Sequence, residues 1–231
     1  MVRILILIGV MIPTLAWGLE ISPLVSELNL DKKQQYQIRV SNNDSQPVTI
    51  STLVKQLQFD DQSYALAEES SDHIDTVPAA FTLEPGGSRQ VLVIAHPTEH
   101  QQSQSYAIVF SNELLDSQSV DSSITMQVNY NAILHTYKNT HNATISDATL
   151  PVTASNNQWQ FSVTNQGNRY SQLSNYDLEL ISSSGERLIL ASDAIKADGL
   201  DVFFPPKQKR DVTLNSTTIP LSDIVQVRLL K

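Results

Sequence analysis

Hydrophobic and polar side chains alternate along residues 123–138, SITMQVNYNAILHTYK. From 124 to 134, apolar or aromatic residues occupy every second position, and the residues between them at 125, 127, 129 and 131 are polar. Only an extended strand places such a period of two on opposite faces. The pattern therefore predicts one long strand, whose even-numbered side chains from 124 to 134 are Ile124, Met126, Val128, Tyr130, Ala132 and Leu134.

Shorter alternating segments fill most of the remaining chain, and turn residues such as Pro85-Gly86-Gly87 separate them. No segment of ten or more residues carries a helical stripe with caps. The pattern therefore predicts an all-β protein. We expect strands at 24–30, 35–41, 48–59, 80–83, 89–95, 105–110 and 123–137, and then at 149–153, 159–164, 170–180, 187–190, 199–204, 211–214 and 223–230.

The polar segment 137–144, YKNTHNAT, breaks this alternation and is typical of a linker. The strands on each side fit an immunoglobulin-like β-sandwich, and 231 residues are enough for two such domains. We expect an export signal at 1–18, a first domain at 19–138 that ends in the long strand, a hinge at 139–145 and a second domain at 146–231.

Short sequence matches relate the two halves. Val40-Ser41-Asn42 corresponds to Val163-Thr164-Asn165, and Leu83-Glu84-Pro85 corresponds to Phe204-Pro205-Pro206 at nearly the same offset. Two matches in the same order suggest that the domains are duplicates of one another.

The first eighteen residues, MVRILILIGVMIPTLAWG, combine a basic start at Arg3, an apolar run, and the small residues Ala16 and Gly18. This pattern is typical of a cleaved secretory signal. The apolar run is too short to span a bilayer well, and no other segment approaches eighteen apolar residues. We therefore expect an exported protein that does not insert into a membrane.

Composition excludes several kinds of site. The chain has no cysteine, so it forms neither disulfides nor thiolate metal sites. A net charge of −9 at pH 7 repels phosphate backbones and argues against nucleic acid as a partner. Phosphate-loop, dinucleotide and nucleophile-elbow motifs are missing from the sequence, so we expect no cofactor.

One short motif resembles a catalytic site. The segment 96–100, His-Pro-Thr-Glu-His, matches the H-x-x-E-H pattern of a group of zinc peptidases. A predicted strand precedes it and a polar segment follows it, whereas the zinc motif requires a helix. This context favours a solvated turn, and we expect neither a metal site nor an enzyme.

Several features together resemble the periplasmic pilus-assembly chaperones of the chaperone–usher pathway. They are the signal, two linked sandwiches without cysteine, the segment FTLEPGGSR at 81–89, the strand at 106–110 and the long strand before the hinge. The segment VTNQGNR at 163–169, followed by Leu173 and Leu178, is similar to the alternative, archaic branch of these chaperones. The resemblance covers nearly the whole mature chain.

The resemblance implies a boomerang of two immunoglobulin-like domains that binds a pilus subunit and delivers it to an outer-membrane usher. Such a subunit lacks one strand, and the chaperone lends it an edge strand, a form of β-augmentation. The donor side chains would be Ile124, Met126, Val128 and Tyr130, and burying four such groups contributes about 6–12 kcal/mol before ordering costs. Whether the free protein covers this edge by self-dimerisation stays open.

This sequence departs from the family at one point. The better-studied branch binds the subunit's terminal carboxylate with an Arg on the first strand and a Lys on the donor strand, a charge-assisted contact. Counting along this chain places Ser26 and Ile133 at those positions. Either the register slips, or strand pairing and hydrophobic contact dominate and Lys138 or Arg39 contributes charge nearby; we favour the second interpretation.

Two alternatives remain beside the chaperone. A secreted two-domain adhesin or matrix protein would use a similar edge for self-association, and it would form stable homopolymers without a partner. A zinc hydrolase, the third hypothesis, would carry stoichiometric zinc.

Overall fold

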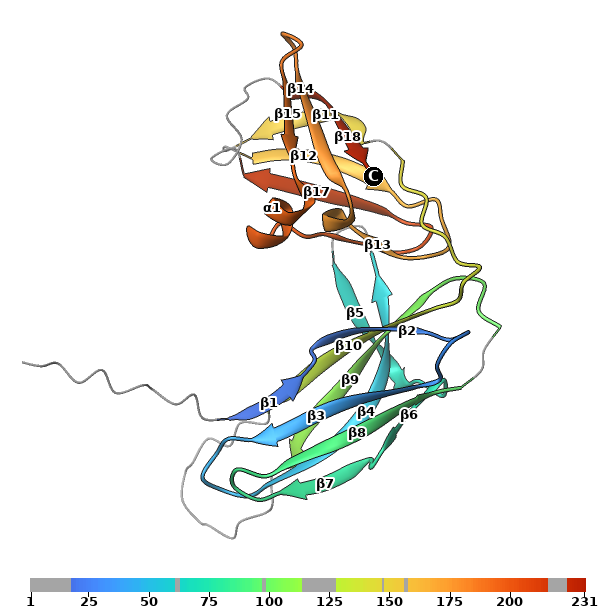
Figure 1. The fold of residues 1–231 in the computed structure, drawn as a ribbon, viewed down its shortest axis with the longest axis vertical. Helices are drawn as coiled ribbons and strands as arrows, with labels where there is room; N and C mark the ends of the chain where they lie inside the picture. The colour runs from blue at the N-terminus through green and yellow to red at the C-terminus, as the bar shows by residue number, and fades with distance from the viewer. Residues whose placement is uncertain are drawn as a thin grey trace, which may run out of the picture.

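The structure, a computed structural model, describes residues 18–60, 63–96, 99–113, 128–146, 148–155, 158–215 and 224–231. Strands dominate this part of the chain and form two lobes, which a linking segment after Tyr137 joins along one side (Figure 1). The prediction of an all-β boomerang of two sandwich domains is confirmed. In the described part of the chain, no helix has the length and apolarity that a membrane span requires.

The first domain is a sandwich of two sheets. One sheet has the order β1-β3-β8-β6, formed by β1 (Leu19–Ser22), β3 (Gln35–Asn42), β8 (Ser88–Ala95) and β6 (Ile74–Val77). The other has the order β2-β10-β9-β4-β5, formed by β2 (Val25–Asn29), β10 (Asn129–Tyr137), β9 (Gln104–Glu113), β4 (Val48–Phe59) and β5 (Tyr64–Ser70), and β7 (Ala80–Leu83) also pairs with β4.

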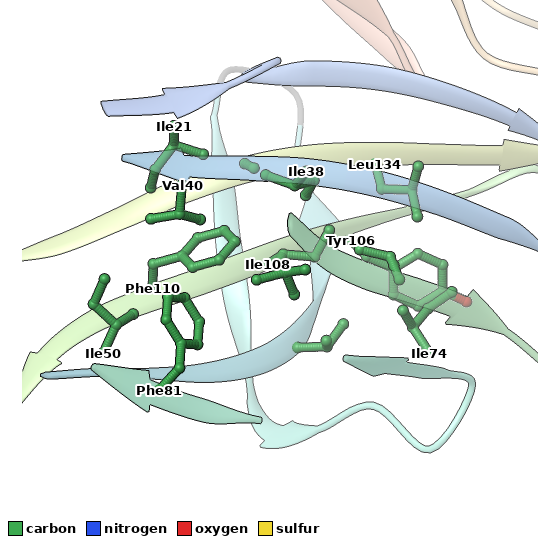
Figure 2. Close-up of a cluster of buried hydrophobic side chains, with 14 of the residues drawn as sticks. Ile21, Ile38, Val40, Ile50, Ile74, Phe81, Tyr106, Ile108, Phe110 and Leu134 are labelled. Carbon is green, nitrogen blue, oxygen red and sulfur yellow. The ribbon is translucent and has the colours of Figure 1, made fainter. Parts of the chain in front are cut away.

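Large apolar side chains from the sheet that contains β10 pack against Ile21, Ile38 and Val40 from the sheet that contains β3. Phe110, Phe81 and Ile50 lie together at one end of this core, and Tyr106 and Leu134 lie toward the other end (Figure 2). All five are nearly or completely buried. Because the chain has no cysteine, no disulfide supports this packing.

The second domain has its own core and smaller sheets. Its strands are β11 (Thr149–Ser155), β12 (Gln158–Thr164) and β17 (Lys209–Asn215) in one sheet, β15 (Arg187–Leu190), β14 (Asp177–Ser182) and β18 (Ile224–Leu230) in another, and the short pair β13 (Ser171–Gln172) and β16 (Phe203–Phe204). Trp159, Phe161 and Leu178 are among its buried residues, and Ile145 packs against them. The division at residues 139–145 stays a prediction.

The second domain differs from the predicted strands in two places. The strand expected at 170–180 is wrong as one element, because a 3-10 turn at Leu173–Asn175 separates β13 from β14 and the N–H of Tyr176 donates to the carbonyl of Leu173. The strand expected at 199–204 is reduced to β16. A short helix, α1 (Ser192–Ala197), precedes it and buries Ile195.

The first domain contains three strands that the pattern did not predict: β1, β5 and β6. β1 and β6 have four residues each, too few to display a period of two. β5, YALAEES, carries mostly exposed side chains and so lacks an apolar face. The positions of these three strands follow from pairing with their neighbours rather than from alternation.

The duplication is visible in two buried asparagines, Asn42 and Asn165. The Nδ2 of Asn42 donates to the carbonyls of Gln46 at 2.8 Å and Leu83 at 3.2 Å, and the Nδ2 of Asn165 donates to those of Arg169 at 2.7 Å and Phe204 at 3.2 Å. Each Oδ1 accepts the backbone N–H two residues later at 3.0 Å. Within each domain, the two matched motifs therefore lie together, and the asparagine joins a turn to the neighbouring strand.

Replacing Asn165 with Ala should lower the free energy of unfolding of the second domain by about 2–4 kcal/mol, because buried carbonyls lose their donors. Urea denaturation followed by the fluorescence of Trp159 measures this. Gln160→Ala, an exposed change on β12, is the control and should stay within about 0.5 kcal/mol. Equal stability of the two variants would contradict the role given to Asn165.

Candidate functional site

One edge of β10 is paired with a neighbouring strand over almost its whole length, and the other edge is only partly paired. β9 pairs with β10 from Asn129 to Thr136 in antiparallel register. β2 pairs with the other edge in parallel, but only from Ile133 to Tyr137. No strand within the described residues pairs with this edge of β10 from Asn129 to Ala132.

A change of sheet by the first strand leaves this edge open. β1 pairs with β3 in one sheet, and after Pro23 the chain crosses to the other sheet and continues as β2. Proline cannot donate a backbone hydrogen bond, so it is suited to a break between strands. Leu24 and Val25, where β2 begins, are 57% and 55% exposed.

Backbone hydrogen bonds show which groups face the open edge. The N–H of Ile133 donates to the carbonyl of Leu24 at 2.7 Å, whereas the carbonyl of Val128 accepts from Asn112 of β9. Neighbouring residues of a strand direct their N–H and C=O groups to opposite edges. Asn129 and Asn131 therefore present their backbone groups to the open edge.

The even-numbered side chains of β10 leave the core gradually toward the start of the strand. Leu134 and Ala132 are buried, Tyr130 is partly buried against the core, and Val128 is 40% exposed. Val128 and Tyr130 line a hollow of about 210 Å³ together with Leu19 and Val48. The other two predicted donor residues, Ile124 and Met126, lie outside the described residues.

The two predicted charged contacts lie in different parts of the molecule. Lys138 directly follows β10, and its backbone N–H donates to Nδ1 of His141 at 3.2 Å. Arg39 is exposed on β3, in the sheet opposite β10, and its Nη2 donates to Ser88 Oγ at 2.9 Å. Lys138 is thus close to the hinge, and Arg39 is not.

Ser26 and Ile133, the counted carboxylate-binding positions, make neutral contacts. The hydroxyl of Ser26 donates to that of Tyr36 at 2.6 Å. Ile133 packs against Leu57 and Ala107 on the outer face of the sheet.

A cleft of about 490 Å³ lies where the two domains and the hinge meet. Arg169 lines it beside Tyr170, and both residues belong to the second domain. One guanidinium nitrogen of Arg169 lies 3.6 Å from a carboxylate oxygen of Glu27 on β2, and its Cζ lies 3.7 Å from the ring centre of Tyr137. Lys231 also lines this cleft, so both of the described Lys and Arg residues in its lining come from the second domain.

The hydroxyl of Tyr170 is buried and forms no hydrogen bond of ordinary geometry with the described residues, although Glu27 and Arg169 lie beside it. Burial raises the pKa of Tyr170 above its ordinary value, and the neighbouring Glu27 raises it further. The hydroxyl therefore stays protonated and can donate to a ligand in the cleft.

Arg169 is not among the site residues predicted from the sequence, although the segment 163–169 carries part of the family resemblance. The available signal was its place immediately after Asn165 and its turn, in the segment that carries the family resemblance. Its approach to Glu27 depends on how the second domain docks, which a count along one strand does not reveal.

Gly167 allows the hinge to pass close to the second domain. A methyl group on Gly167 would collide with the carbonyl oxygen of Asn142 and lie 2.5 Å from the backbone nitrogen of Thr144. The same close approach lets the carbonyl of Asn142 accept hydrogen bonds from the N–H groups of Asn168 and Arg169, at 2.9 and 3.1 Å.

The H-x-x-E-H residues do not converge. His96 Nε2 lies 2.7 Å from Asp75, while the ring of His100 packs edge-on against His73 at 4.8 Å. Within the described ranges, no group of three or more His, Asp or Glu residues is placed to hold a metal ion.

Sequence comparison finds no relative: no protein-family model matches this chain, and no curated protein sequence matches it. Comparison with solved structures does find similar proteins. The class 5 fimbriae chaperone CfaA is 12% identical, has a TM-score of 0.60, and aligns over 93% of this chain and 99% of its own. A chain of the Salmonella enterica complex of SafA pilin with the SafB chaperone is 14% identical, has a TM-score of 0.54, and aligns over 89% and 86%.

The E. coli chaperone DraB is 13% identical and has a TM-score of 0.52, with 86% of this chain and 85% of its own aligned. These alignments extend across both domains and the hinge. The family resemblance found in the sequence is thereby confirmed at the level of the fold.

Gly167→Ala should weaken the attachment of the second domain, because the hinge has to move away from the new methyl group. We expect faster proteolytic cleavage within residues 138–146, measured by limited proteolysis. Gln166→Ala, an exposed change in the same loop, should leave the rate unchanged. Equal cleavage of both variants would show that the close approach at Gly167 is unimportant.

This chain has the two-domain fold of the fimbrial chaperones of the chaperone–usher pathway.

Proposed function

We propose that this protein is a periplasmic chaperone of pilus assembly, which binds an unassembled fimbrial subunit by lending it β10 and then delivers it to an outer-membrane usher. The observation that carries the proposal is the open edge of β10 from Asn129 to Ala132, on a fold shared with fimbrial chaperones. Among the similar structures, the SafB chaperone is in complex with SafA pilin, and a further chain with a TM-score of 0.60 and 12% identity comes from a complex of a chaperone with a tip adhesin.

Strand addition uses both the backbone and the side chains of β10. The backbone groups of Asn129 and Asn131 would pair with a strand of the subunit, and the exposed Val128 would enter its groove together with Ile124 and Met126. Tyr130, which already contacts the chaperone's own core, would sit at the boundary. Release needs no chemistry, because exchange for a neighbouring subunit's strand can proceed downhill.

Arg169 is our candidate for binding the subunit's terminal carboxylate, the contact that Ser26 and Ile133 cannot make. It lines the cleft beside the buried hydroxyl of Tyr170, and Glu27 is its present partner. A guanidinium suits a carboxylate because its N–H groups form paired, charge-assisted hydrogen bonds. An entering carboxylate would compete with Glu27 for it.

Asn131→Pro should abolish recovery of a one-to-one complex when the chaperone is co-expressed with a pilin encoded beside it. Proline removes the N–H that faces the open edge but none of the bonds to β9. The double change Met126→Glu and Val128→Glu should have the same effect, because charges would enter an apolar groove. Complex recovery by affinity purification and size-exclusion chromatography measures both effects.

Asn131→Ala retains the N–H, and Val77→Glu changes an exposed residue on β6, so both controls should bind as the parent does. If the proline and double-glutamate variants still protect the pilin, β10 is not the donor strand. Homopolymers formed without a pilin would instead support the adhesin alternative.

Arg169→Met should weaken binding of an intact subunit about 10- to 100-fold, which corresponds to one charge-assisted contact. Glu27→Gln should leave binding unchanged or strengthen it, because it removes the competing carboxylate. Calorimetric titration with a donor-strand-deficient subunit measures both. If the two variants weaken binding equally, the Glu27–Arg169 pair is only a structural link.

A further inference from the structure

Two histidines occupy the contacts that join the domains. The ring of His135, on β10, is stacked 4.7 Å from Phe203 at an interplanar angle of 16° and lies 4.8 Å from Tyr170, so second-domain residues cover it. Its Nδ1 lies 2.8 Å from the hydroxyl oxygen of Ser105. The side chain is only 5% exposed.

The second histidine, His141, is in the hinge and is also 5% exposed. Its Nδ1 accepts the backbone N–H of Lys138 at 3.2 Å, so that nitrogen carries no proton. Adding a proton there would place a donor against a donor. The next residue, Asn142, is the one whose carbonyl receives the N–H groups of Asn168 and Arg169.

Residues 166–170 of the second domain, which we call the junction loop, are held from a second side by the loop before β9. The N–H of Ser103 donates to the carbonyl of Asn168 at 2.8 Å, and the N–H of Tyr170 donates to Ser103 Oγ at 2.9 Å. The junction loop thus contacts His135 in the first domain, and it is bonded to the hinge at Asn142, the residue next to His141.

We propose that this junction is a proton-sensitive joint: a proton taken up by His135 or His141 detaches the junction loop from the first domain, and the angle between the domains becomes variable while both sandwiches stay folded.

The charges around each ring do not favour a proton. Glu27 is opposite His135 in the strand register, but its carboxylate is already paired with Arg169. Lys138 and Arg169 act against protonation of His141, whereas Asp31 and the backbone carbonyl of His100 act in its favour. His100 itself faces His73, Lys138 and His141, and its pKa is lowered, first by burial.

The direction of the pH effect follows from burial. Burial lowers the pKa of His135 from 6.5 to about 4, and burial also lowers the pKa of His141. An opened junction returns both rings to water, where they titrate near their ordinary value. The attached state of the junction loop therefore keeps its full stability above pH 6.5 and loses it as the pH falls toward 4. From His135 alone, the ratio of attached to detached molecules falls on the order of a hundredfold between pH 7.5 and 4.5.

The absence of cysteine from the chain allows a direct test. Spin labels at Gln90→Cys and Ser183→Cys, both exposed, report the distance between the domains. We expect a narrow distance distribution at pH 7.5 and a broad one at pH 4.5, with unchanged far-ultraviolet circular dichroism and unchanged Trp159 fluorescence.

The double variant His135→Phe and His141→Asn should keep the narrow distribution at pH 4.5, because phenylalanine preserves the stack and the asparagine oxygen can accept the Lys138 N–H. His96→Gln, which changes an exposed histidine paired with Asp75, should broaden as the parent does.

A distribution that stays narrow at pH 4.5 in the parent overturns the proposal. So does equal broadening in the double variant, or broadening that coincides with loss of circular dichroism, since acid would then unfold the domains. Small-angle scattering of the unlabelled protein needs no substitution, and an unchanged maximum dimension between the two pH values would also overturn it.

Discussion

Every backbone N–H and C=O group in a sheet needs a partner, and β10 is arranged so that some of its groups lack one within the described chain. The cause is the sheet change at Pro23, which sends β1 to one sheet and starts β2 only at Val25. The same strand continues into the hinge at Tyr137. One element thus forms the core, the open edge and the approach to the second domain, so its register fixes the geometry of all three.

Alternation along the chain was enough to predict the fold class, because long half-buried strands such as β4 and β10 display a period of two. It failed for β1, β5 and β6, which are too short or too polar to show an apolar face. The paired motifs around Asn42 and Asn165 were a thin signal in the sequence. The structure explains them, because the side-chain amide of each asparagine donates to a backbone carbonyl of the second motif in the same domain: Asn42 to Leu83, and Asn165 to Phe204.

The site was harder to predict than the fold. The period of two indicated the strand β10, because alternation is a local property. In the structure its even face leaves the core gradually, and Val128 is 40% exposed. The charged residues near the cleft could not be predicted from alternation, because they are far from β10 in the sequence. Arg39, which was predicted to contribute charge near the subunit, lies on β3 in the sheet opposite β10. Arg169 lies 3.6 Å from Glu27, and Gly167 lets the hinge lie close to the loop that carries Arg169.

The second domain is also attached to the first through the hairpin formed by β4 and β5. The guanidinium of Arg210, on β17, donates to the carbonyls of Asp60 and Ser63 in the β4–β5 hairpin, and Phe203 stacks on Phe59 beside it. Phe203 also stacks on His135 of β10, so the hairpin contacts and the junction contacts share one aromatic side chain. A displacement of Phe203 would therefore disturb the β4–β5 hairpin and β10 together, so the two sets of contacts between the domains depend on each other.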